Sequence, residues 1–127
     1  MAIDLAKVNL ILQGLVINTV GVQGAALVTP DGLPLASMLP ADMDEERVAA
    51  MSAAMLSLGE RISVELNRGN AHRILVEGDQ GYGVLTQCGE DAVLVVLASL
   101  HTKQGVLLFE IKQAVAELKQ LLPTSPG

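Results

Sequence analysis

The chain has 127 residues, half of them apolar, and carries a formal net charge of −6 at pH 7. This length gives room for one domain, and the apolar share predicts a globular chain. Eight Lys and Arg residues are scattered along the sequence, and Tyr82 and Phe109 are its only aromatic residues. A nucleic-acid surface needs a basic stripe and stacking rings, and anionic membranes repel acidic proteins. The composition therefore argues against both partners.

Cysteine usage and hydropathy predict a cytoplasmic protein. Cys88 is the only cysteine, so an internal disulfide cannot form and a reducing compartment is expected. The first residues lack the basic-then-apolar order of a signal peptide. The longest apolar run, Ala92–Ala98, is far shorter than the ~20 residues that a membrane span needs.

The first 40 residues predict a helix followed by a β-hairpin. Asp4 is a candidate N-terminal cap for a helix that ends at Gly21. The apolar face of this helix comprises Leu5, Val8, Leu12, Leu15 and Val16. Two apolar runs, residues 23–28 and 33–38, flank the sequence Thr-Pro-Asp-Gly, which predicts a turn. Pro34 cannot donate a ladder hydrogen bond, so the second arm should be an edge strand.

The longest helical pattern, residues 42–68, has too few polar residues for a helix with one buried side. Asp42 and Glu45 resemble a capping box at its start, and Gly69 is a plausible stop. A stripe at steps of three and four comprises Val48, Met51, Met55, Leu58, Ile62 and Leu66. The residues between are mostly small, forming a second face that another backbone could approach closely. We therefore expect one face to cover the sheet and the other to meet a second protein, most simply another copy.

The remaining sequence predicts three strands in a meander and a last helix. Residues 71–77, 82–88 and 92–99 are strand-like and are separated by glycine-containing turns. The last run does not alternate, which is typical of a central strand with helices above and below. The final helix, residues 103–122, has an apolar face made of Leu107, Ile111, Ala114, Leu118 and Leu121. Pro123 ends it, and residues 123–127 are expected to be a disordered tail.

These elements predict an α/β (α+β) fold in a single domain spanning residues 1–122. The expected sheet has five mostly antiparallel strands in the order 2-1-5-4-3. The first and last helices should cover one face, leaving the long helix for the other. The third strand is then an open edge, thinly protected by Arg73, Glu77 and His72, and such an edge invites symmetric pairing.

Motifs for catalysis, cofactors or metals are weak throughout the sequence. The glycines of residues 78–83 lie between two strands, with no helix N-terminus to hold a phosphate, and are interpreted as a hairpin turn. His72, His101 and Cys88 lack the spacing of metal ligands, and Cys88 is expected to be half-buried in a strand. No G-x-S-x-G elbow is present, so a hydrolase is not expected. The arginines are interpreted as surface residues rather than as an arginine finger.

Several stretches together resemble the roadblock/dynein light chain family. They are Gly24-Ala25-Ala26-Leu27-Val28 with Pro30-Asp31-Gly32, Leu58-Gly59-Glu60-Arg61, and Gly81-Tyr82-Gly83-Val84. The resemblance covers residues 8–122 and implies a roadblock/profilin-like fold. Members of this family form dimers in which the third strands pair and the middle helices lie side by side. The resemblance therefore implies a dimer interface at or near Met51, Ala54, Met55, Leu58, Ile62, Ile74 and Val76.

The resemblance also implies a function. Bacterial, MglB-like members bind small Ras-like GTPases and regulate their nucleotide state. We expect a non-catalytic homodimer without cofactors that regulates or scaffolds a small Ras-like GTPase. Two alternatives stay open: a scaffold with no effect on any nucleotide, and a small-molecule sensory domain, which would need an internal cavity.

Overall fold

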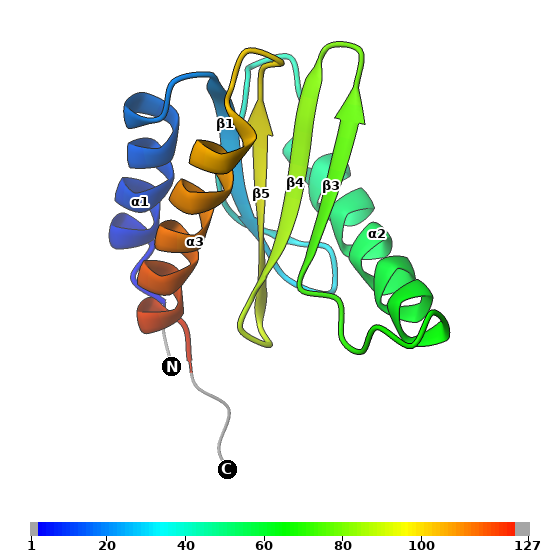
Figure 1. Cartoon of the computed structure of the whole chain (residues 1–127). Coiled ribbons are helices and arrows are strands. Elements are labelled where there is room, and N and C mark those ends of the chain that lie inside the picture. Colours follow the sequence, from blue (N-terminus) through cyan, green and yellow to red (C-terminus); the bar gives the residue numbers. More distant parts are fainter. Residues whose placement is uncertain (1–2, 124–127) are drawn as a thin grey trace.

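A computed structural model describes residues 3–123, which form three helices and five strands (Figure 1). The element order matches the order predicted from the sequence. The elements are α1 (Leu5–Asn18), β1 (Val22–Val28), β2 (Pro34–Met38), α2 (Glu45–Glu65), β3 (Arg73–Gly78), β4 (Gly81–Cys88), β5 (Ala92–Ala98) and α3 (Gln104–Leu121). Of the predicted tail, residues 124–127 lie outside the described residues.

The sheet is antiparallel throughout and has the strand order β2-β1-β5-β4-β3, as predicted. Central strand β5 pairs with β1 on one side and with β4 on the other; Leu94, for example, lies opposite both Leu27 and Thr86. Pro34 is the first residue of β2, which is an edge strand, and both positions tolerate a residue without an N–H group. The opposite edge is β3.

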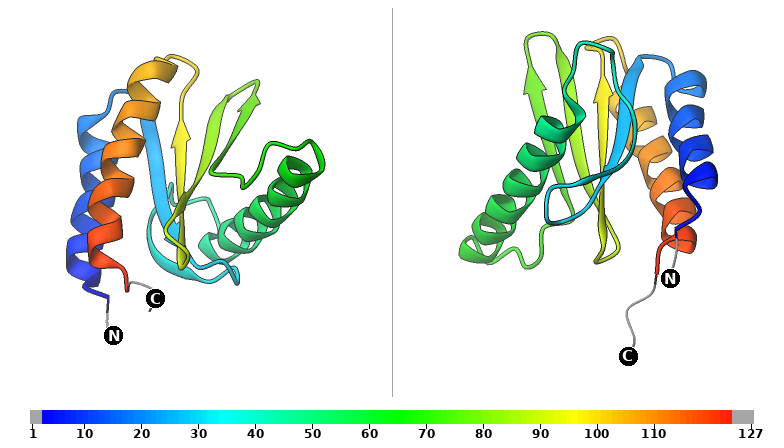
Figure 2. Two further views of the ribbon diagram at one scale, coloured as in Figure 1. Left: turned by 60° about the horizontal axis from the view of Figure 1, so that its bottom comes forward. Right: turned by 180° about the vertical axis from the view of Figure 1, so that it is seen from behind.

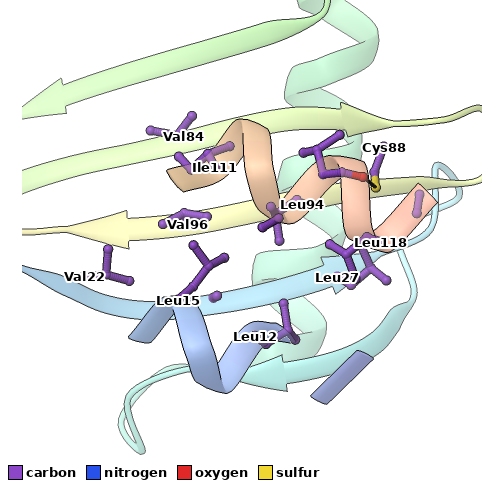
Figure 3. Packing of buried hydrophobic residues seen from close by; sticks show 14 of the residues in the cluster. Leu12, Leu15, Val22, Leu27, Val84, Cys88, Leu94, Val96, Ile111 and Leu118 are labelled. Atoms are coloured by element: carbon purple, nitrogen blue, oxygen red, sulfur yellow. Dashed lines mark hydrogen bonds between the residues drawn. The ribbon is translucent and has the colours of Figure 1, made fainter. Parts of the chain in front are cut away.

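Helices cover both faces of the sheet, so the chain folds into three layers (Figure 2). α1 and α3 lie side by side on one face, and α2 lies on the other. The larger core cluster fills the space under α1 and α3 (Figure 3), with Leu12, Leu94, Ile111 and Leu118 fully buried. The smaller cluster lies on the α2 side. Strand β5 contributes to both, because Leu94 faces one and Val95 the other.

α1 begins where the sequence predicts and ends earlier. The Asp4 side chain accepts a hydrogen bond from the backbone N–H of Lys7 at 3.2 Å, which confirms the cap. The helix ends at Asn18, and Gly21 lies in the following turn with a φ of +91°. A Cβ at this position would lie 1.8 Å from the Thr102 hydroxyl oxygen. Gly21 is therefore needed because the loop that precedes α3 lies so close to it, and not because it ends the helix.

The predicted capping box of α2 is wrong by two residues. Asp44 is the N-cap, and its carboxylate accepts hydrogen bonds from the N–H groups of Glu46 at 3.0 Å and Arg47 at 3.3 Å. The Glu45 carboxylate does not reach back to Asp42, because it accepts a hydrogen bond from the Ser37 hydroxyl of β2. This contact with the edge strand fixes the start of the helix.

The end of α2 also differs from the prediction. The helix ends at Glu65 rather than near Gly69, because Asn67 adopts a left-handed conformation with a φ of 59°. The Asn67 N–H then bonds the Val64 carbonyl at 3.0 Å, and the Arg68 N–H bonds the Ser63 carbonyl at 2.7 Å. This pair of bonds is a Schellman motif, which satisfies two carbonyls of the last turn.

The loop after α2 shortens the predicted third strand. The backbone N–H of Ala71 donates to the Glu60 carboxylate at 2.7 Å, so Ala71 is held against the helix and β3 begins only at Arg73. α3 spans Gln104–Leu121, one residue shorter than predicted at each end. Four of its five predicted core residues are buried, and Leu121 is half-buried.

The position of the α2 cap can be tested by mutation. Asp44→Ala should lower the free energy of unfolding by about 1 kcal/mol, because two helix N–H groups lose their acceptor. Asp42→Ala is the matched control and should change it by less than ~0.5 kcal/mol. Both values can be measured by urea denaturation. Equal losses in the two variants would contradict the assignment of Asp44 as the cap.

Candidate protein-interaction surface

α2 contacts the sheet mainly through small side chains, together with the half-buried Val48 and Leu56. Ala49 and Ser52 are buried, and Ala53 is half-buried. Farther along the helix, a Cβ at Gly59 would lie 2.5 Å from Cδ1 of Ile74 on β3, so the glycine makes room for that side chain. The small-residue face is thus the face that its own sheet approaches. The other large apolar residues of the helix are exposed.

Five of the six residues in the predicted stripe are exposed, whereas Val48 is half-buried against the smaller core cluster. Met51, Met55, Leu58 and Ile62 are between 43 and 60% exposed, although they follow one another at steps of four, three and four. Ala54, which borders this stripe, is exposed as well. A contiguous exposed apolar surface on a small protein is typical of a site that another molecule covers. We call Met51, Met55, Leu58 and Ile62 the α2 stripe.

The edge strand β3 lies beside the α2 stripe. It pairs with β4 along one side, and its other side is the edge of the sheet. Ile74 and Val76 lie opposite Leu85 and Gly83, which places both on the α2 side of the sheet. Val76 is exposed, whereas Ile74 is half-buried against the helix. α2 crosses the strands obliquely, and its C-terminal end projects beyond β3 (Figures 1 and 2).

One surface hollow joins helix and strand. It measures about 480 Å³, and its lining includes Met55 and Ile62 of α2 together with Ile74 of β3. The structure thus brings together three of the seven residues that the sequence predicts at an interface. Met51 is exposed nearer the start of α2, and Val76 lines a different hollow with Met43 and Leu97.

Arginine is concentrated on this side of the molecule, a signal that the sequence prediction did not use. All four arginines are exposed and lie on α2, on β3 or between them; they are Arg47, Arg61, Arg68 and Arg73. The four lysines lie on or next to α1 and α3; they are Lys7, Lys103, Lys112 and Lys119. Protein interfaces are enriched in arginine and depleted of lysine, so this division favours an interface on the α2–β3 side.

The glycine-rich segment 78–83 is a hairpin turn, as predicted. Gly78 and Gly81 pair across a two-residue loop, and β4 follows directly, so no helix N-terminus is available for a phosphate. Gly81 has a φ of +151°, and a Cβ there would lie 2.4 Å from the Ala98 carbonyl oxygen. Close packing against β5 therefore accounts for this glycine.

Cys88 is more deeply buried than the sequence predicted. Its side chain is fully covered by α3, where the thiol is 3.8 Å from the Val115 carbonyl oxygen to which it donates. Burial raises the pKa of the Cys88 thiol to about 11, although the Lys119 ammonium group acts in the opposite direction. A thiol with this pKa is protonated at neutral pH and is a poor nucleophile or metal ligand.

Residues 3–123 offer neither a metal cluster nor a membrane-spanning helix. No group of three or more His, Cys, Asp and Glu side chains in this range is arranged to hold a metal ion. None of the helices in the same range has the length and apolarity needed to cross a membrane.

Comparisons with known proteins agree with this architecture. The sequence profile of the Roadblock/LC7 domain matches residues 8–98. An uncharacterized protein of Methanocaldococcus jannaschii is 33% identical over 104 residues, covering 82% of this chain and 90% of that protein. The structure of Myxococcus xanthus MglB has a TM-score of 0.86 at 21% identity, covering 92% of this chain and 95% of that one. A Roadblock/LC7 domain from Streptomyces avermitilis has a TM-score of 0.82 at 23% identity, covering 87% and 93%.

The three-layer arrangement and the strand order define an α+β module of the roadblock type. The chain belongs to the Roadblock/LC7 family, because the family profile spans most of its length. The resemblance noted from the sequence is thereby confirmed.

The buried thiol predicts a specific pH dependence. Because the Cys88 pKa is about 11 in the folded chain and 9.0 in the unfolded one, its contribution to stability is complete below pH 9. The contribution is lost as the pH rises from 9 toward 11, since the unfolded state releases the proton first. Urea denaturation across this range should show a steeper loss for the wild type than for Cys88→Ala. Identical slopes would contradict the burial of the thiol.

Proposed function

We propose that the protein is a homodimer, joined through α2 and β3, that binds a small Ras-like GTPase. The observation that carries the proposal is the α2 stripe, whose four large apolar side chains are exposed beside an open sheet edge. Because these side chains are about half exposed, covering one of them contributes roughly half of the ~1.5–3 kcal/mol that full burial is worth. Pairing of two copies would cover the α2 stripe and the open sheet edge at the same time.

Simple geometry relates the two features. A two-fold axis perpendicular to the sheet at the β3 edge makes two β3 strands antiparallel neighbours. The same axis keeps both α2 helices on one side of the joined sheet and makes them antiparallel too.

The interface residues in the proposed dimer are those implied by the family resemblance. They are Met51, Ala54, Met55, Leu58 and Ile62 on α2, with Ile74 and Val76 on β3. The five α2 residues and Val76 are exposed, which supports the proposal. Ile74 is half-buried against α2, so only its exposed part is available for the contact.

The proposed action on the GTPase is conformational. The partner is inferred from the resemblance to MglB-like members of the family. A dimer that binds one nucleotide state more tightly shifts its partner toward that state, at about 1.4 kcal/mol for each tenfold difference in affinity. Such selection needs a shaped surface and no catalytic group from this chain. Regulation by selective binding is therefore favoured over an arginine supplied in trans.

A single charged substitution tests the proposed dimer. Met55→Glu should raise the dimer dissociation constant at least about 100-fold, because it places two unpaired carboxylates in an apolar contact. Val64→Glu is the matched control: Val64 is similarly exposed on the same helix but lies off the α2 stripe. Sedimentation velocity over a range of concentrations gives both constants. A Met55→Glu variant that sediments like the wild type would contradict the interface.

Nucleotide selectivity separates a regulator from a passive scaffold. We expect the wild-type dimer to bind the GTP-loaded and GDP-loaded forms of a small Ras-like GTPase from the same genome with affinities that differ at least about tenfold, or ~1.4 kcal/mol. Calorimetry with a non-hydrolysable GTP analogue and with GDP measures both. Equal affinities, together with unchanged hydrolysis and exchange rates, would mean that the protein only tethers its partner.

A further inference from the structure

We propose that the groove between α1 and α3 binds an amphipathic helix with basic flanks, supplied by another protein. This surface lies on the opposite side of the sheet from α2 (Figure 2) and does not depend on the proposed function. The α1–α3 groove measures about 340 Å³. Its lining includes Leu10, Gly14 and Asn18 of α1 and Glu110, Gln113 and Glu117 of α3.

Large apolar side chains border the groove without contributing to the core. Leu10 and Ile17 are 66% and 68% exposed, and they lie on the same side of α1 as Gly14, at steps of four and three. Apolar residues at this spacing are the pattern with which helices contact one another.

Gly14 is the observation that points to a close contact from outside. A glycine inside a helix lowers its stability relative to alanine. Nothing in the fold requires it, because a Cβ at this position would meet only the Asn18 side-chain nitrogen, at an ordinary 3.8 Å. Gly59 of α2 differs, since the Ile74 side chain occupies its space. A second backbone lying across α1 would account for Gly14.

The negative charge that lines the groove favours a basic partner. Glu110 and Glu117 are seven residues apart, or two helical turns, and both line the groove. None of the described residues lining it is basic. A helix with lysine or arginine at positions two turns apart would pair with both carboxylates. Anionic lipid would be repelled by them, and a second copy would place the same two glutamates against its own pair.

The experiment uses a synthetic peptide as the probe. α1 has 14 residues and is therefore about 21 Å long, so the probe is a 14-residue, fluorescein-labelled helix with leucines along one face and lysines beside them. The comparison peptide carries glutamate at every lysine position. Fluorescence anisotropy with the full chain should show at least tenfold tighter binding of the lysine peptide, with affinity that falls as salt is added. No measurable binding of the lysine peptide, or equal binding of both peptides, would overturn the proposal.

Three variants locate the binding site. Gly14→Leu should fill the groove and weaken binding of the lysine peptide at least tenfold, while its melting temperature stays at or above that of the wild type. The double variant Glu110→Lys and Glu117→Lys should weaken it by a similar factor. Asn9→Leu is the control and should change affinity less than twofold, because Asn9 is exposed, lies outside the groove lining and, five residues before Gly14, is on another face of α1. Unchanged binding by Gly14→Leu would overturn the assignment of this groove.

Two further measurements test other occupants of the groove. Wild type and Gly14→Leu should sediment with the same dependence on concentration. Neither should co-sediment with phosphatidylserine-containing vesicles. A change in self-association caused by Gly14→Leu would make a second copy the occupant, and vesicle binding lost in that variant would make it a membrane. Either result would overturn the proposal.

Discussion

The close contact between α2 and the sheet is the constraint on which the outer surface depends. Ala49, Ser52 and Gly59 occupy the side of the helix that faces the β-strands, so the helix lies near the sheet. Of its large side chains, Val48 and Leu56 pack into the thin core there. The other large apolar residues, such as Met55 and Leu58, are exposed. The hydrophobic free energy that they carry is not realised within one chain and remains for a contact with another molecule.

The two faces of the sheet consequently have different roles. The α1–α3 side contains the larger core, with Leu12, Ile111 and Leu118 fully buried, and accounts for most of the buried apolar surface. The α2 side has a thin core and an apolar exterior. The proposed dimer surface and the proposed helix-binding groove lie on opposite sides of the sheet, so occupation of one leaves the other accessible. In the proposed arrangement, two copies therefore pair on one side of the sheet while the helix binds on the other.

Much of this fold could be predicted from local sequence signals. Pro34 marks an edge strand and the unbroken run Ala92–Ala98 a central one, and these two assignments fix the strand order. The start of α2 could not be predicted, because Asp42 and Asp44 both suit a cap and the choice depends on the Ser37–Glu45 contact. Periodicity located the α2 stripe but could not show that the small residues, rather than the large ones, face the sheet. The full burial of Cys88 likewise depends on where α3 lies.

Hydrogen exchange measured at several protein concentrations tests the central claim most directly. If two copies pair through α2 and β3, amides of β3 and of the α2 stripe should exchange more slowly as the concentration passes the dimer dissociation constant. Amides of β2, the opposite edge, should exchange at the same rate throughout, since that edge stays outside the contact. Exchange in β3 that does not depend on concentration, in a protein that nonetheless self-associates, would contradict the account.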